Sequence, residues 1–142
     1  MRIKVEPGFL RGRVERMICS KSQGHRALIC AAMAETETLL TGLDENDDLM
    51  ATEACLKQLG AGFRREAEGI RISPLGPPVA EQVVLDCGES GSTLRFLLPL
   101  AAVRGQKAAL TGRGRLSQRP LSPLYEEMQA HGCSFRNRGA FR

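Results

Sequence analysis

The sequence predicts an α/β (α+β) protein built from two copies of one supersecondary unit. When the chain is aligned with itself at an offset of about 70 residues, serines, paired alanines and a Leu-Thr-Gly triplet coincide in both copies. Within each copy, Ala- and Leu-rich runs of helical composition alternate with short apolar runs bounded by Gly and Pro. An apolar fraction of 42% over 142 residues is enough for a buried core. The predicted order within a unit is β, α, β, α, β, β.

The first copy begins with a loop rich in Ser and Gly that leads into an Ala/Leu-rich helix. Gly42 ends the following strand, and the acidic cluster at residues 44–48 supplies N-cap acceptors for a second helix that ends at Gly60. A Glu-Gly pair then separates two hairpin strands, and prolines end the unit. In chain order, the predicted elements are a helix, a strand, a helix and two hairpin strands, over residues 25–34, 36–41, 49–59, 62–67 and 70–73.

The second copy opens with an apolar strand, and a Gly-rich turn connects that strand to a helix. A proline stands close to the start of the last helix. The predicted elements are a strand, a helix, a strand, a helix and a hairpin strand, over residues 82–86, 93–103, 107–111, 120–132 and 133–137. The partner of that hairpin strand would follow Gly139, so we expect the chain to stop inside an element. The two units would span residues 20–78 and 79–142, after a separate segment at residues 1–19.

Composition favours small anionic ligands. The net charge of +4 arises from 20 basic and 16 acidic residues. Of the basic residues, 16 are Arg, whose planar side chain suits bidentate capture of phosphate or carboxylate. A single Tyr, no Trp and scattered Arg residues argue against a nucleic-acid surface, which usually needs a basic stripe or stacking aromatics. We therefore expect small-molecule partners and no nucleic acid.

The sequence also predicts a cytoplasmic protein. Its five cysteines form no C-x-x-C pair, so they indicate neither a zinc site nor a disulfide framework and fit a reducing compartment. The N-terminus lacks the apolar region of a signal peptide, and the longest apolar stretch, residues 94–103, is too short to span a bilayer. We expect no membrane partner.

Three loop segments could bind anions. Residues 20–26 place hydroxyls, an ammonium and a guanidinium at a loop-to-helix junction, where free backbone N–H groups are also available. Residues 86–95 form a strand, a Gly-rich turn and a helix start, and residues 113–120 form a basic turn in which Arg119 precedes a helix. Each segment alone also fits an ordinary capped helix or a solvated loop.

Other chemistry matches the residues less well. The Gly-rich segment is not a Walker loop, and Ser92 stands where a G-x-S-x-G nucleophile elbow needs glycine. His131, which follows a helix end, is a weak candidate for the base of a serine hydrolase. The acidic cluster at residues 44–48 could suggest a metal site, but its place before a helix favours N-capping and compensation of the helix dipole.

Taken together, three stretches resemble, in order and spacing, the three N-terminal signatures of the EPSP synthase (3-phosphoshikimate 1-carboxyvinyltransferase) family. They are S-K-S-Q-G-H-R-A-L-I-C-A-A-M-A, D-C-G-E-S-G-S-T-L-R-F-L-L-P-L-A-A and L-T-G-R-G-R-L-S-Q-R-P-L-S-P-L, at residues 20–34, 86–102 and 110–124. The resemblance covers nearly the whole chain. It implies a two-domain protein of six βαβαββ units in the inside-out α/β barrel fold of the enolpyruvyl transferases, of which this chain would hold about two. Residues 1–19 would then be a strand segment of the other domain.

The resemblance also implies an activity. Members of the family transfer the enolpyruvyl group of phosphoenolpyruvate to the 5-hydroxyl of shikimate 3-phosphate and release phosphate, in the shikimate pathway to chorismate and the aromatic amino acids. They would need no metal or cofactor, and the complete protein would be a monomer. The family's general base and general acid would lie beyond Arg142, so this chain would contain no catalytic residue, and we expect it to be inactive alone.

The family's binding residues correspond to positions in the three signatures. Lys21, Ser22 and Arg26 would hold shikimate 3-phosphate, and Lys21 together with Gly91 and Arg119 would contact phosphoenolpyruvate. The chain departs from the family pattern just before the first signature, where Met17-Ile18-Cys19 stands in place of the usual proline.

Two alternatives stay open. A UDP-N-acetylglucosamine enolpyruvyl transferase shares the fold, but it typically has asparagine in place of Ser22 and a reactive cysteine in the loop at residues 112–118, which contains none here. The other alternative is a noncatalytic anion-binding or RNA-binding module on the same fold.

Overall fold

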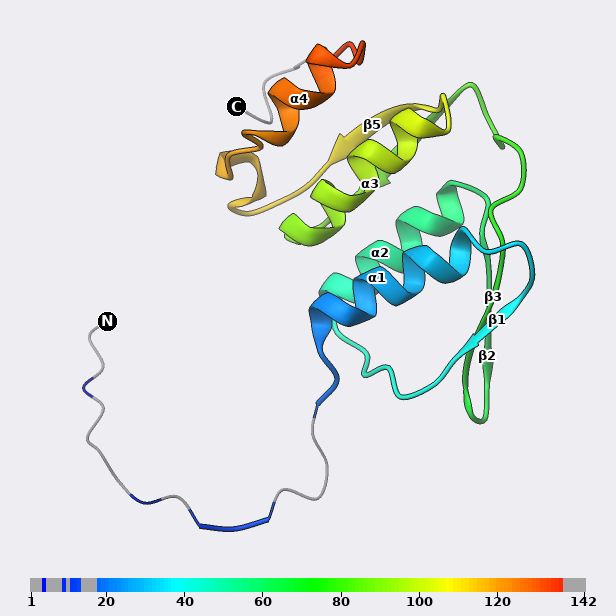
Figure 1. The fold of residues 1–142 in the computed structure, drawn as a ribbon, viewed down its shortest axis with the longest axis vertical. Helices are drawn as coiled ribbons and strands as arrows, with labels where there is room; N and C mark the ends of the chain where they lie inside the picture. The colour runs from blue at the N-terminus through cyan, green and yellow to red at the C-terminus, as the bar shows by residue number, and fades with distance from the viewer. Residues whose placement is uncertain (1–3, 5–8, 10, 14–17, 137–142) are drawn as a thin grey trace.

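The computed structural model describes residues 4, 9, 11–13 and 18–136 (Figure 1). These residues form four α-helices, five strands and one 3-10 helix. In chain order they are α1 (Lys21–Ala32), β1 (Thr38–Leu40), α2 (Asp47–Gln58), β2 (Gly62–Glu66), β3 (Gly69–Ser73), β4 (Gln82–Asp86), α3 (Gly91–Val103), β5 (Lys107–Thr111), the 3-10 helix η1 (Leu116–Gln118) and α4 (Leu124–Ala130). The mixed helix and strand class predicted from the sequence is confirmed, while the six-unit barrel remains a prediction.

The central elements agree closely with the sequence prediction. The strands at residues 82–86 and 107–111 are confirmed residue for residue. Helices α1 and α3 begin earlier than predicted, because Ser20 and Ser90 accept hydrogen bonds from backbone N–H groups of the first turn and so cap each helix directly before Lys21 and Gly91.

The C-terminal part differs most from the prediction. Helix α4 begins at Leu124 instead of near Pro120, and residues 116–118, just before the predicted start, form a 3-10 turn that buries Leu116 in the core. The predicted strand at residues 133–137 is wrong for residues 133–136, where the Cys133 amide instead donates to the Met128 carbonyl and closes the end of α4. The rest of that hairpin, and most of the predicted strand segment at residues 1–19, lie outside the described residues.

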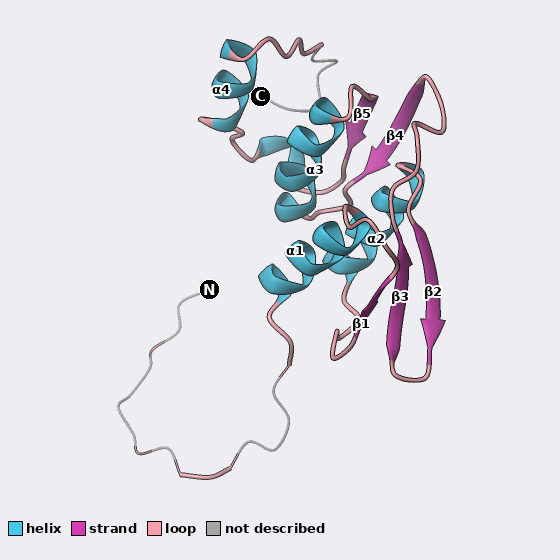
Figure 2. Ribbon diagram, turned by 45° about the vertical axis from the view of Figure 1, so that its right-hand side comes forward, coloured by secondary structure: helices cyan, strands magenta, loops and turns pink. Residues whose placement is uncertain are grey.

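The strands form two small sheets. In the first, β3 lies between β1 and β2 and pairs antiparallel with both, with Ile72 opposite Thr38 on one side and Phe63 on the other. In the second, β4 and β5 are parallel, with Val84 opposite Ala109, and α3 makes the crossover between them. Figure 2 shows the two sheets in magenta beside the helices.

One hydrophobic core joins three of the helices and both sheets. Leu28 of α1, Leu56 of α2, Ile72 of β3, Leu85 of β4 and Leu97 of α3 belong to a single buried cluster. Each buried side chain of this kind contributes roughly 1.5 to 3 kcal/mol through removal of apolar surface from water. The core holds α1, α2 and α3 side by side, with their N-terminal ends on the left of Figure 1. Among the described residues, none of the helices has the length and apolar character needed to cross a bilayer.

Gly69 should be required for the pairing of β1 with β3. A Cβ added there would lie 2.1 Å from the backbone oxygen of Leu40, and a backbone oxygen cannot move aside as a flexible side chain can. We expect Gly69→Ala to lower the free energy of unfolding by about 1 to 3 kcal/mol or more in urea titrations. The matched control is Gly76→Ala, whose added Cβ would meet no atom within 4 Å. Equal stability of the two variants would contradict this packing.

Candidate anion-binding site

Three helices begin at the same end of the molecule. Ser20 and Ser90 cap α1 and α3, and Asn46 caps α2 by accepting from the Leu49 amide at 3.0 Å. A helix N-terminus carries a partial positive charge and free N–H groups, so each of these ends attracts an anion. The first turns of α1 and α3 contain no acidic residue, whereas α2 has Asp47 and Asp48. The ends of α1 and α3 therefore favour anionic ligands.

A buried chain of hydrogen bonds connects the three N-terminal ends. The Nδ1 atom of His25 in α1 lies 2.7 Å from Oγ1 of Thr52 in α2, which lies 2.7 Å from Oγ1 of Thr93 in α3. Thr93 Oγ1 lies 2.8 Å from Ser90 Oγ, and Ser90 Oγ accepts from the Thr93 amide at 3.2 Å. The first turns of the helices are thus within side-chain reach of one another.

Lys21, Ser22 and Arg26 lie on the exposed side of the first turns of α1. The Lys21 ammonium is half exposed and pairs with the Asp48 carboxylate of α2 at 2.5 Å. The Arg26 guanidinium donates to the Ser22 carbonyl at 3.0 Å and stands 5.3 Å from the centre of the Phe96 ring of α3. The structure therefore brings together the three residues that the sequence predicted for one ligand.

Gly91 and Arg119 also meet. A Cβ added at Gly91 would lie 2.7 Å from Nη1 of Arg119, so the guanidinium lies directly against the start of α3. Arg119 is exposed, and its amide donates to the carbonyl of the buried Leu116 at 3.1 Å, which anchors this loop. The Arg95 guanidinium of α3 donates to the Pro120 carbonyl and holds the same loop.

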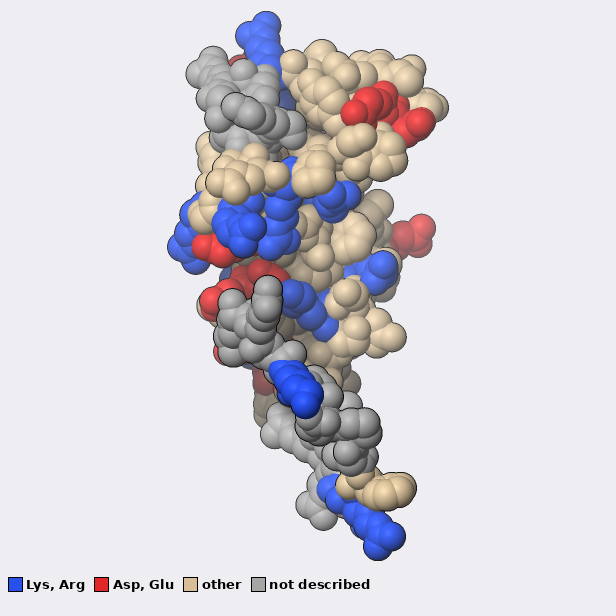
Figure 3. All heavy atoms as spheres, turned by 90° about the vertical axis from the view of Figure 1, so that its left-hand side faces the viewer, with Lys and Arg blue, Asp and Glu red and all other residues tan. Residues whose placement is uncertain are grey.

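The loops that follow β4 and β5 contact each other closely, next to Gly91 and Arg119. The Arg113 amide donates to the Gly88 carbonyl at 2.8 Å. Gly114 has a φ of +58° and lies so close to Glu89 that an added Cβ would be 2.1 Å from its carboxylate. An added Cβ at Gly112 would lie 2.9 Å from the Gly88 oxygen. Figure 3 faces this end of the molecule and shows Lys and Arg side chains gathered on it.

His25 is fully buried, and burial determines the protonation state of its imidazole. Desolvation by burial lowers the pKa of its imidazole below the usual range, an effect that the Asp48 carboxylate opposes. The charges of Lys21 and Arg26 lower the pKa further. His25 is therefore neutral at physiological pH.

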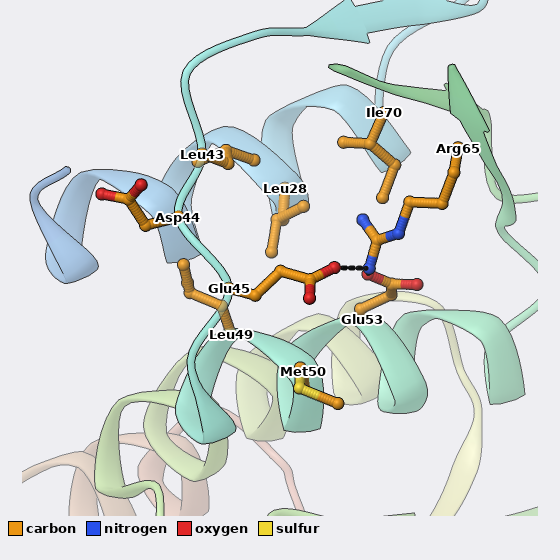
Figure 4. Close-up of a pocket in the computed structure, with 9 residues that line it drawn as sticks. All are labelled: Leu28, Leu43, Asp44, Glu45, Leu49, Met50, Glu53, Arg65 and Ile70. Carbon is orange, nitrogen blue, oxygen red and sulfur yellow. Dashed lines mark hydrogen bonds and ion pairs between the residues drawn. The ribbon is translucent and has the colours of Figure 1, made fainter. Parts of the chain in front are cut away.

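Two hollows are present, and Lys21, Arg26 and Arg119 line neither of them. The cavity in Figure 4 has a volume of about 30 Å³, enough for a water molecule or two but not for a phosphorylated ligand. Arg65 within it is already paired with Glu45 at 3.2 Å and Glu53 at 3.0 Å, so its charge is neutralised. A second hollow of about 380 Å³ lies beside the C-terminal ends of α3 and α4, and its mostly apolar lining does not suit an anion.

Cysteine and metal chemistry find little support in the described part of the chain. A hydrogen bond with Cys55 and burial raise the pKa of the Cys87 thiol well above its ordinary value, so this thiol is not a nucleophile. Within residues 18–136 and the few described before them, no group of three or more His, Cys, Asp or Glu side chains could hold a metal ion.

Known proteins resemble this chain in sequence and in fold. The chain matches the family model described as EPSP synthase (3-phosphoshikimate 1-carboxyvinyltransferase) over residues 5–139. The chain belongs to the EPSP synthase family. It is 37% identical over 140 residues to a 3-phosphoshikimate 1-carboxyvinyltransferase of Clostridium beijerinckii, covering 94% of this chain and 32% of the relative. It is 38% identical over 128 residues to the protein of the same name from Clostridium perfringens strain SM101, covering 88% of this chain and 30% of the relative.

The structural comparison gives the same family. The chain superposes on an EPSP synthase from Acinetobacter baumannii with a TM-score of 0.72 and 25% identity, covering 88% of this chain and 29% of that one. The chain thus spans about a third of the length of the relatives that it matches.

The sequence analysis missed two features of the site. Asp48 was interpreted only as part of an N-capping cluster, yet its carboxylate pairs with Lys21, which is 27 residues away. Thr52 and Thr93 received no role, although a threonine at an otherwise apolar helix position is a visible signal. His25 stood within the first signature, but its burial and its bond to Thr52 depend on tertiary packing.

We expect His25 to make folding stability pH-dependent. Its pKa is lower in the folded chain than the value of about 6.5 in the unfolded chain, so the unfolded state binds the proton first as the pH falls. The free energy of unfolding should therefore decrease as the pH falls below about 6.5, until the folded-state pKa is passed. Urea titrations between about pH 7.5 and pH 5.5 measure this slope. His25→Asn should flatten this slope, and an unchanged slope in that variant would contradict the depressed pKa.

Proposed function

We propose that this chain carries binding groups for shikimate 3-phosphate and phosphoenolpyruvate in an enzyme that transfers the enolpyruvyl group from the second to the first. The observation that carries the proposal is the meeting of cationic side chains with two capped helix N-termini, Lys21 and Arg26 at α1 and Arg119 at α3. Membership of the family, whose relatives are named 3-phosphoshikimate 1-carboxyvinyltransferase, supports the choice of substrates.

Lys21, Ser22 and Arg26 are proposed to hold shikimate 3-phosphate. The Lys21 ammonium and the Ser22 hydroxyl stand at the N-terminal end of α1, where the helix dipole favours a phosphate. Arg26 lies one turn further along, and its stacking over Phe96 limits the positions that its guanidinium can take. Binding would require the phosphate to share Lys21 with Asp48 or to displace it, because the two side chains are paired in the free chain.

Gly91 and Arg119, with Lys21, are proposed to hold phosphoenolpyruvate. A glycine at the start of α3 lets the Arg119 side chain, and a ligand bound to it, approach the backbone closely. The planar guanidinium can bind a carboxylate or phosphate through two parallel hydrogen bonds. The site would then hold the anions of both substrates on one basic face.

The proposed reaction needs such a face. The 5-hydroxyl of shikimate 3-phosphate would attack C2 of phosphoenolpyruvate while C3 is protonated, and the tetrahedral adduct would lose phosphate. Two phosphates and a carboxylate repel one another, so cations fixed in advance lower the energy needed to bring the substrates together. We assign binding roles to the residues of this chain and no general acid or base.

Titration calorimetry of the chain with shikimate 3-phosphate tests the first subsite. Lys21→Ala and Arg26→Ala each remove a charge-assisted contact and should weaken binding by about 1.5 to 3 kcal/mol. Lys107→Ala is the matched control. This exposed lysine begins β5, pairs with Glu81 and lies away from the helix N-termini. Unchanged affinity in both site variants would overturn the assignment. Binding of UDP-N-acetylglucosamine or RNA, without shikimate 3-phosphate, would favour one of the alternative functions.

Gly91→Ala should weaken phosphoenolpyruvate binding more than shikimate 3-phosphate binding. The added methyl group would meet the Arg119 guanidinium at 2.7 Å and displace it, whereas Lys21 and Arg26 would keep their positions. We expect at least about a tenfold loss, or ~1.4 kcal/mol, for phosphoenolpyruvate titrated in the presence of shikimate 3-phosphate. Gly76→Ala is the control for a harmless extra methyl group. Equal losses for the two ligands would contradict the placement of Arg119.

A further inference from the structure

Four polar side chains lie inside the core where the three helices begin. His25, Thr52 and Thr93 are fully buried, and Ser90 is 1% exposed. They come from α1, α2, α3 and the cap of α3, and continuous hydrogen bonds join them. We name this set the buried hydroxyl chain.

Stability alone does not explain these residues. A buried hydroxyl loses its bonds to water, and its internal hydrogen bond does little more than offset that cost. A valine has nearly the volume of a threonine and would fill the same space without any polar group. Hydrogen bonds differ from apolar contacts in direction and distance, so what the buried hydroxyl chain adds is a fixed geometry between the helices.

Each residue of the buried hydroxyl chain is close to a group of the proposed site. His25 directly precedes Arg26 and lies one turn after Lys21 on α1. Ser90 directly precedes Gly91. The backbone carbonyl of Asp48 lies 3.3 Å from Thr52 Oγ1 and 3.2 Å from Thr93 Oγ1, while its carboxylate pairs with Lys21. The buried hydroxyl chain therefore connects the backbone segments that carry the residues of both subsites.

The bonding also defines the state of the imidazole. Nδ1 of His25 bonds to Thr52, while Nε2 is buried with no partner among the described residues. The neighbouring charges are Asp48 on α2 and Lys21 and Arg26 on α1, and the ring that faces His25 from α3 is that of Phe96. An imidazolium would place a second N–H donor where nothing accepts it. Neutral His25, with Nδ1–H donating to Thr52 and an unprotonated Nε2, leaves no buried donor unpaired.

We propose that His25, Thr52, Thr93 and Ser90 are positioning residues that fix the N-terminal ends of α1, α2 and α3 relative to one another. They hold the subsite of Lys21 and Arg26 at a set separation from the subsite of Gly91 and Arg119. The identity of the anions rests on the proposed function, but the positioning itself does not.

Hydrogen exchange of the ligand-free chain tests the positioning directly. The amides of Gly24, Met50 and Leu94 make the first backbone hydrogen bonds of α1, α2 and α3, to residues 20, 46 and 90. Thr52→Val should speed exchange of these three amides at least about tenfold, with a smaller change at the Leu59 amide at the far end of α2. Thr52→Ser, which keeps the hydroxyl, should restore the slow rates.

Ile72→Val is the matched control. It trims a fully buried side chain on β3 and weakens the core without touching a hydroxyl, so it should not single out the three first-turn amides. Unchanged first-turn exchange in Thr52→Val, or acceleration that is uniform along the helices, would overturn the proposal.

Ligand binding provides the second readout. Thr52→Val should leave the affinity for shikimate 3-phosphate within about threefold. With shikimate 3-phosphate bound, the same variant should bind phosphoenolpyruvate at least about tenfold more weakly, because binding both ligands together requires the correct spacing between the helices. Thr52→Ser should restore the second affinity. If the wild-type chain binds neither ligand, the proposed function fails, and the exchange experiment still decides whether the buried hydroxyl chain positions the helices. If both ligands bind and Thr52→Val affects neither, the positioning role is excluded.

Discussion

The structure depends on holding three helix N-termini at one end of the molecule. Like ends of helix dipoles repel, so this arrangement needs forces that offset the repulsion. The leucine-rich core shared by the helices and both sheets supplies most of the binding between them. Asp48 contributes a carboxylate at the point where positive charge accumulates, and it pairs with Lys21. Lys21, Arg26 and Arg119 remain exposed at this end, and clustered cations favour the binding of an anionic ligand.

The same constraint explains why cations of different kinds occur on this face. Arg26 is positioned by stacking on Phe96 and by the Ser22 carbonyl, whereas Lys21 is positioned by a carboxylate that an anionic ligand can replace. Arg119 is held by a loop whose Leu116 is anchored in the core. Lys21 is thus held by a carboxylate, Arg26 by a carbonyl and a ring, and Arg119 through the backbone of its loop.

Sequence reasoning succeeded where local signals decide the structure. The strands at residues 82–86 and 107–111 carry short apolar runs between strong turn residues. Sequence reasoning failed where contacts between residues far apart in the sequence determine the structure. The 3-10 turn at residues 116–118 was not predicted, and its Leu116 packs into a core formed by remote residues. The pairing of Lys21 with Asp48 and of Thr52 with Thr93 joins segments far apart in the chain, and no local pattern encodes such distances.

The interlocked loops after β4 and β5 have a consequence for how this protein can change over evolutionary time. A Cβ at Gly112 would clash with the Gly88 backbone oxygen on the opposite loop and with the Leu116 side chain on its own loop, whereas a Cβ at Gly114 would meet the carboxylate of the exposed Glu89. A substitution at Gly88 would not make room for a larger residue at position 112, because the atom in the way is a backbone oxygen. Since one loop leads into Gly91 and the other into Arg119, the close backbone approach at Gly112 restricts which substitutions the connection between these two residues can accept.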